Sequence, residues 1–140
     1  MSNDNIVTLP SRKRPLSISV LWIGNALLAA FLIAASLIAE YRGFTGGQAA
    51  IAGLFGLAIS IAAHVMWYGN RWGRLALLLL LSIFLGLVVI HSVMMINWAD
   101  ETGYSGSLAD WAVARLVLSI VWLSVNYWFL LRKRARMFFA

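Results

Sequence analysis

Three side chains that can carry a positive charge lie inside mainly apolar segments of this sequence: His64, His91 and Arg115. An ionisable group is costly in hydrocarbon, so within a membrane it usually faces other protein and marks either a function or a need for a partner. Imidazole can hydrogen-bond across helices or bind a metal, and a guanidinium can pair with a carboxylate. Which of these applies depends on the side chains that share a helix face with the three residues.

Polar residues recur at helical spacing along these segments. Arg115 is followed by Ser119, Trp122 and Asn126 at intervals of four, three and four, which places them on one helix face. The first apolar segment carries a similar stripe: Asn25, Ala29, Leu32, Ser36 and Glu40. The middle segments present Gly53, Ser60 and His64, and then His91 with Phe84, Leu87, Met95 and Trp98. Three of the four segments thus carry a polar stripe, and we expect these stripes to face one another.

Four apolar segments must position these residues. They occupy 16–39, 48–68, 75–96 and 108–131, and each is long enough to cross a bilayer, which takes about 20 residues. Hydrophobic residues make up 62% of the 140 residues and charged ones 11%, which is about half the charge of a soluble domain. The connections are short, so sequential helices should be antiparallel neighbours. We therefore predict an all-α integral membrane protein, an up-down bundle of four transmembrane helices.

The basic residues predict the orientation of the bundle. Nine of them flank the helices on one side: Arg12, Lys13, Arg14, Arg71, Arg74, Arg132, Lys133, Arg134 and Arg136. The positive-inside rule makes that side cytoplasmic, together with both termini. We expect a disordered cytoplasmic tail at 1–15, a basic cytoplasmic tail at 132–140, and a location in a bacterial-type cell inner membrane.

The net charge of +6 describes these flanks. They would meet anionic lipid at the cytoplasmic face of the bilayer. Nucleic-acid binding is the weaker explanation, and we expect none.

Residue counting sorts the polar groups into two layers. His64 and Asn126 lie about 9 Å to the cytoplasmic side of the bilayer centre, with Asn25 nearer the middle. His91 and Arg115 lie roughly 7–9 Å to the outer side. We expect mainly apolar side chains between the two layers.

Each layer has a structural and a functional interpretation. In the inner layer, Asn, Ser and His can hydrogen-bond across helices, a contact that contributes about 0.6–2 kcal/mol. In the outer layer, Arg115 could extend toward the headgroups or pair with Glu40, which is its most plausible acidic partner if the first and last helices are adjacent. For the outer layer, a structural ion pair and a functional site both remain possible interpretations.

The sequence offers little support for a cofactor or an enzyme. His64 and His91 lie in opposite leaflets and cannot ligate one iron within a monomer, although a symmetric dimer could pair His64 with its copy. His91 and Met95 have the spacing and ligand types that would suit copper(I), but the signal is weak. There is no cysteine, and no serine, histidine and acid converge. We expect no metal, no cofactor and no catalytic residues.

Small residues at spacings of four and three define a packing seam on the second segment: Ala49, Gly53, Gly56, Ser60 and Ala63. Small residues let helix backbones approach closely in a membrane. We expect this seam to pack against the first helix or against the same helix of a second copy.

These features favour a non-enzymatic inner-membrane protein that forms a homo-oligomer or serves a larger membrane complex. The alternative is a small transporter or channel that works as an oligomer, with the two polar layers as gates. A redox subunit that binds haem, quinone or copper is a weaker third possibility.

Overall fold

The computed structural model describes residues 16–42, 47–103, 107–132, 135, 138 and 139. Four helices account for nearly all of them: α1 (Leu16–Tyr41), α2 (Gly47–Trp67), α3 (Arg71–Thr102) and α4 (Ser107–Leu131). All four are long and apolar enough to span a bilayer. The predicted all-α, four-helix up-down architecture is confirmed, and the chain is a multi-pass membrane protein. The predicted tail 1–15 lies outside the described residues.

Helix α3 is longer than predicted. It has 32 residues, whereas the apolar run at 75–96 predicted 22. Its N-terminus is capped by Asn70, whose side chain accepts a hydrogen bond of 2.8 Å from the Trp72 amide. It ends only at Gly103, which adopts the left-handed conformation with φ 65°. The helix continues past the apolar run because residues 97–102 contain no helix-breaking glycine or proline.

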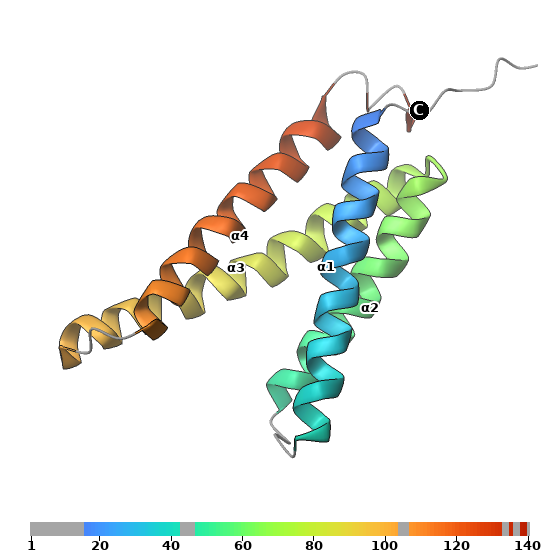
Figure 1. Cartoon of the computed structure of the whole chain (residues 1–140). Helices are drawn as coiled ribbons and strands as arrows, with labels where there is room; N and C mark the ends of the chain where they lie inside the picture. The colour runs from blue at the N-terminus through green and yellow to red at the C-terminus, as the bar shows by residue number, and fades with distance from the viewer. Residues whose placement is uncertain (1–15, 43–46, 104–106, 133–134, 136–137, 140) are drawn as a thin grey trace, which may run out of the picture.

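The helices form two antiparallel hairpins, α1–α2 and α3–α4, which spread apart toward one end (Figure 1). We call the end at which α1 begins and α4 ends the terminal end, and the opposite end the distal end. Toward the distal end α1 and α4 diverge, so the four helices do not form a tightly closed bundle along their whole length.

Within the first hairpin, the glycines of the seam allow α1 and α2 to touch. A Cβ atom on Gly56 would lie 2.9 Å from the Ala29 carbonyl oxygen and 2.9 Å from Ile33 Cγ1. One on Gly53 would lie 2.7 Å from Ser36 Oγ. Both glycines therefore pack against α1 of the same chain.

The other seam residues contribute unequally. Ala63 is buried with the core and Ala49 is half-buried. Ser60 is exposed, so it takes no part in the tight contact.

Glycine also sets the crossing of α2 and α3 at the terminal end. A Cβ atom on Gly73 would lie 2.5 Å from the Met66 amide nitrogen, so the two backbones meet there almost directly. Met66, Leu77 and Leu81 are fully buried beside this crossing. Part of the predicted basic tail joins the same cluster, since Phe139 is buried and its ring lies 5.2 Å from the Arg74 guanidinium.

The two ends of the molecule differ in charge. Arg71, Arg74 and Arg132 lie at the terminal end, where the Arg132 guanidinium lies 4.8 Å from the Trp128 ring. Asp100, Glu101 and Asp110 flank the α3–α4 connection at the distal end. Basic side chains stacked on aromatic rings are typical of the headgroup level of a membrane.

Replacing Gly56 by leucine should destabilise the protein far more than replacing Gly86. The added side chain at position 56 must push α1 away from α2, at a cost of about 1–3 kcal/mol, whereas a Cβ atom on Gly86 meets nothing within 4 Å. Both variants put leucine for glycine in a spanning helix, so helix propensity and hydrophobicity are matched. Leu79→Ala should be nearly silent, because Leu79 is 62% exposed. Thermal unfolding in detergent measures all three, and equal shifts for the two glycine variants would contradict the tight α1–α2 contact.

Candidate intramembrane binding site

A buried amide cluster joins the two hairpins. Asn25 of α1 donates from Nδ2 to Asn126 Oδ1 of α4 at 2.8 Å, and both side chains are fully buried. Asn25 Oδ1 accepts from Trp122 Nε1 at 3.1 Å, and Asn126 Nδ2 donates to the Trp122 carbonyl oxygen at 2.9 Å. Each side-chain oxygen and nitrogen of the two amides thus has a protein partner, so this cluster is a structural clamp between α1 and α4.

Trp122 fills the space beside the clamp. The ring lies directly against Gly24 of α1, where a Cβ atom would overlap it. The contact explains why an aromatic residue stands near the middle of α4, away from the membrane interfaces. It also closes one end of the space between α1 and α4.

A second polar cluster lies toward the distal end of α3 and α4. Arg115 Nη2 lies 2.8 Å from His91 Nδ1, and Arg115 Nε donates to Ser92 Oγ at 3.2 Å. Ser92 is fully buried and donates its own hydroxyl to the Val88 carbonyl oxygen. The guanidinium is therefore held against α3 by two acceptors.

A guanidinium has only donors, so His91 Nδ1 is the acceptor in this hydrogen bond. The two described contacts of Arg115 use two of the five N–H groups of its guanidinium. The described acidic side chains Asp100, Glu101 and Asp110 make no ion pair with Arg115. Among the described side chains, the cation has hydrogen-bond acceptors but no counter-charge.

Glu40 was the predicted partner of Arg115. It lies in α1, but its side chain falls outside the described part of the structure, so the ion pair stays a prediction. The distal ends of α1 and α4 diverge, and this separates the end of α1 from the first turns of α4 (Figure 1). The partners that the structure does show, His91 and Ser92, come from α3.

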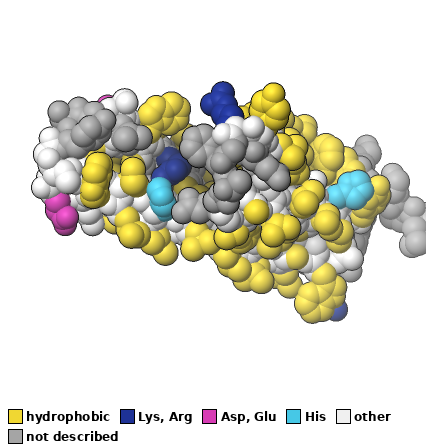
Figure 2. All heavy atoms as spheres, turned by 90° about the horizontal axis from the view of Figure 1, so that it is seen from below, with side chains coloured by type: hydrophobic (Ala, Val, Ile, Leu, Met, Phe, Trp, Pro, Cys, Tyr) yellow, Lys and Arg dark blue, Asp and Glu magenta, His cyan; other side chains and the backbone are white. Residues whose placement is uncertain are grey.

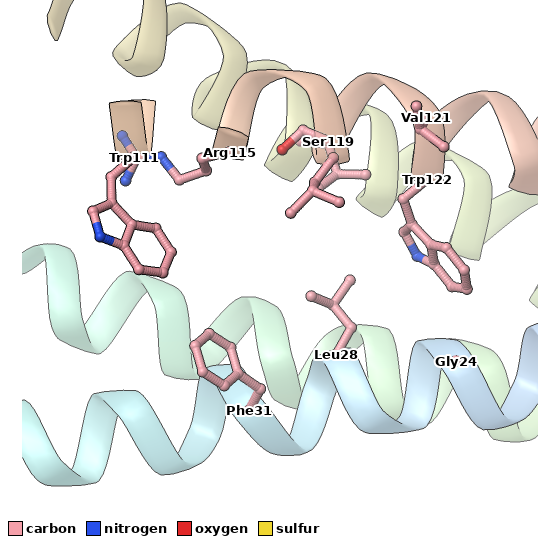
Figure 3. Close-up of a pocket in the computed structure, with 10 residues that line it drawn as sticks. Gly24, Leu28, Phe31, Trp111, Arg115, Ser119, Val121 and Trp122 are labelled. Atoms are coloured by element: carbon pink, nitrogen blue, oxygen red, sulfur yellow. The ribbon is translucent and has the colours of Figure 1, made fainter. Parts of the chain in front are cut away.

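Between the two clusters runs a groove of about 590 Å³. Figure 3 shows Leu28 and Phe31 of α1 facing Arg115, Ser119 and Trp122 of α4 across it. Trp111 and Arg115 stand at its distal end, and Gly24 and Trp122 close the other. The lining is apolar apart from Arg115, Ser119 and the two indole N–H groups.

The two histidines occupy separate places. Figure 2 shows them as two cyan patches, of which one adjoins a dark-blue arginine. His64 is exposed at the terminal end of α2, with its ring edge-on to Tyr68 at 5.1 Å. It lines a smaller cavity of about 260 Å³ beside Trp22 and Ser60. His64 therefore does not join the clamp of Asn25 and Asn126, although the three lie on stripes that we expected to face one another.

Metal ligands do not gather in the described part of the chain. No three histidine or acidic side chains there lie together. His91 Nδ1 is already bonded to Arg115, so a metal at that atom would have to displace the guanidinium.

Comparisons of the chain with profiles of known protein families, with curated proteins and with solved structures gave no match. The function must therefore be inferred from the residues themselves.

Sequence reasoning missed two parts of this site. Ser92 follows His91 directly, and its position on the next helix face gave no sign that it reaches Arg115. The groove itself has no sequence signal, because it arises from the angle between the hairpins. What the sequence did predict is the shared helix face of Arg115, Ser119 and Trp122, all three of which line the groove.

A double-mutant cycle between Arg115→Lys and His91→Phe should reveal the contact across α3 and α4. Lysine loses the planar fork that bonds His91 and Ser92 together, and phenylalanine removes the Nδ1 acceptor. We expect each variant to lower unfolding stability in detergent, with a coupling of about 0.6–1.7 kcal/mol.

Ser124→Ala is the matched control, because Ser124 bonds only its own helix at Ile120. It should add to Arg115→Lys without coupling. Coupling to Glu40→Gln in place of His91→Phe would instead support the ion pair that the sequence predicted.

Proposed function

We propose that this chain is a non-enzymatic protein of a bacterial-type inner membrane that acts by binding within the bilayer, as an accessory or oligomerising subunit. The observation that carries the proposal is the groove between α1 and α4. Four helices of this length could have closed around one core, yet α1 and α4 are clamped at a single depth and then diverge. The space left between them is large, apolar and open toward the membrane, which suits an apolar partner.

The geometry favours binding over conduction. A transporter or channel needs a continuous polar lining, and Leu28, Leu118 and Trp122 line the groove between Arg115 and the clamp. The amides of the clamp are hydrogen-bonded to each other and to Trp122, and both are fully buried, so they do not line a path for a solute.

The charge distribution supports an orientation with both termini in the cytoplasm. Arg71, Arg74 and Arg132 lie at the terminal end and the described acids lie at the distal end. A cysteine introduced by Asn3→Cys should resist an impermeant thiol reagent in intact cells, and one introduced by Ser105→Cys should react. The chain has no cysteine of its own, so labelling reports the new site alone. The reverse pattern would overturn the orientation.

Photo-crosslinking in native membranes tests whether the groove is occupied. A photoreactive amino acid in place of Leu118, in the groove wall, should give a defined adduct. The same residue in place of Ile120 should give only diffuse labelling, because Ile120 lies on the same helix and is 50% exposed outside the groove. An adduct of twice the chain mass identifies a second copy, other protein adducts identify a complex, and lipid adducts identify a lipid. Indistinguishable labelling at the two positions would contradict the proposed binding role.

A further inference from the structure

We propose that the α1–α4 groove binds one anionic phospholipid of the distal leaflet, with its phosphate at Arg115 and one acyl chain along the groove. The inference rests on the proposed function, since it names the occupant of the same groove. Three features of the described residues carry it: an uncompensated cation, the length of the groove and the way the groove is closed.

The cation is placed where a lipid phosphate can reach it. Arg115 is exposed, and its described partners, His91 and Ser92, satisfy hydrogen bonds without supplying negative charge. Side chains on a helix lean toward its N-terminus, which for α4 is the distal end. Arg115 lies eight residues below the start of α4 at Ser107, or about 12 Å along the axis. Its long side chain therefore extends from within the hydrocarbon toward the distal headgroups.

The groove matches one leaflet in length. From Trp111 to Trp122 it follows eleven residues of α4, which is about 16 Å. Half of the hydrocarbon core of a bilayer is about 15 Å. The Arg115 side chain leans toward Trp111, so a lipid whose phosphate meets its guanidinium would place its chain along Leu28 and Leu118 and end it near Trp122.

The closed end favours a lipid chain over a partner helix. Trp122 against Gly24 and the amide clamp stop the groove near the middle of the membrane. A transmembrane helix crosses the whole bilayer and would be obstructed there, whereas an acyl chain ends at the midplane. A helix would also have to bring an acid to Arg115, whereas an anionic lipid supplies both the charge and the apolar chain.

Native mass spectrometry of the purified full-length protein tests this. The probes are dioleoyl phosphatidylglycerol and dioleoyl phosphatidylcholine, which share their chains and differ in net charge. The wild type should retain the anionic lipid about fivefold better, the order expected for one basic residue that faces anionic lipid. Arg115→Gln should abolish this preference. Arg42→Gln, which removes an exposed arginine at the distal end outside the groove, should keep it.

A second pair of variants tests the chain-binding part without touching the charge. Leu118→Trp fills the groove and should reduce retention of both lipids. Ile120→Trp adds the same ring outside the groove and should leave retention unchanged. If Arg115→Gln fails to fold, this pair still tests whether a lipid chain occupies the groove.

The outcomes separate this inference from the proposed function. Equal loss of preference in Arg42→Gln and Arg115→Gln, or equal retention by Leu118→Trp and the wild type, would overturn the lipid site. If position 118 also gave a protein adduct in membranes, the binding role of the groove would stand with a different occupant. If it gave no defined adduct, both would fall.

Discussion

The clamp of Asn25, Trp122 and Asn126 determines how the two hairpins meet. A carboxamide in hydrocarbon without partners costs several kcal/mol, so the three groups must remain together wherever the rest of the helices lie. Because the clamp is the contact that ties α1 to α4, it acts as a pivot. On its terminal side the Gly73 crossing holds α2 and α3 together. On its distal side α1 and α4 are free to diverge, and the groove is the result.

The divergence of α1 and α4 changes the surroundings of Arg115, the cation in α4. In a closed four-helix bundle, Arg115 would face α1 and could be neutralised within the core. In this arrangement it lies on a groove wall, where His91 and Ser92 of α3 hold it by hydrogen bonds. Those two contacts fix the direction of the guanidinium and leave its charge uncompensated among the described residues. The clamp and Arg115 are therefore linked, because the divergence of α1 and α4 beyond the clamp opens the groove and places Arg115 on its wall.

The sequence predicted the helices and their polar faces, but not the angles between them. Run length and composition were enough for four spans, and spacing alone placed Asn25 and Asn126 on facing stripes. The same reasoning assumed a closed bundle. On that assumption Glu40 was predicted to pair with Arg115, and His64 was predicted to lie in one layer with Asn25 and Asn126. The angle between two helices depends on the size of the side chains where they touch. Examples are the Trp122 ring of α4 against Gly24 of α1, and the close approach of the α2 backbone to Gly73 of α3. Periodicity carries no information about such contacts, so neither the groove nor the role of Ser92 could be read from it.

The two polar clusters differ in charge and in how far their polar atoms have partners in the protein, and from this difference we infer a structural role for the first and a binding role for the second. In the clamp, each amide oxygen and nitrogen has a partner in the protein, and both amide side chains are fully buried. At Arg115 the protein provides two acceptors for five donors, and its described residues provide no anion. A buried network that satisfies itself stabilises one arrangement of helices. A partly satisfied cation at membrane depth can instead gain stability from an anion supplied from outside the protein. Arg115 is thus the residue through which the proposed anionic lipid would act on the fold.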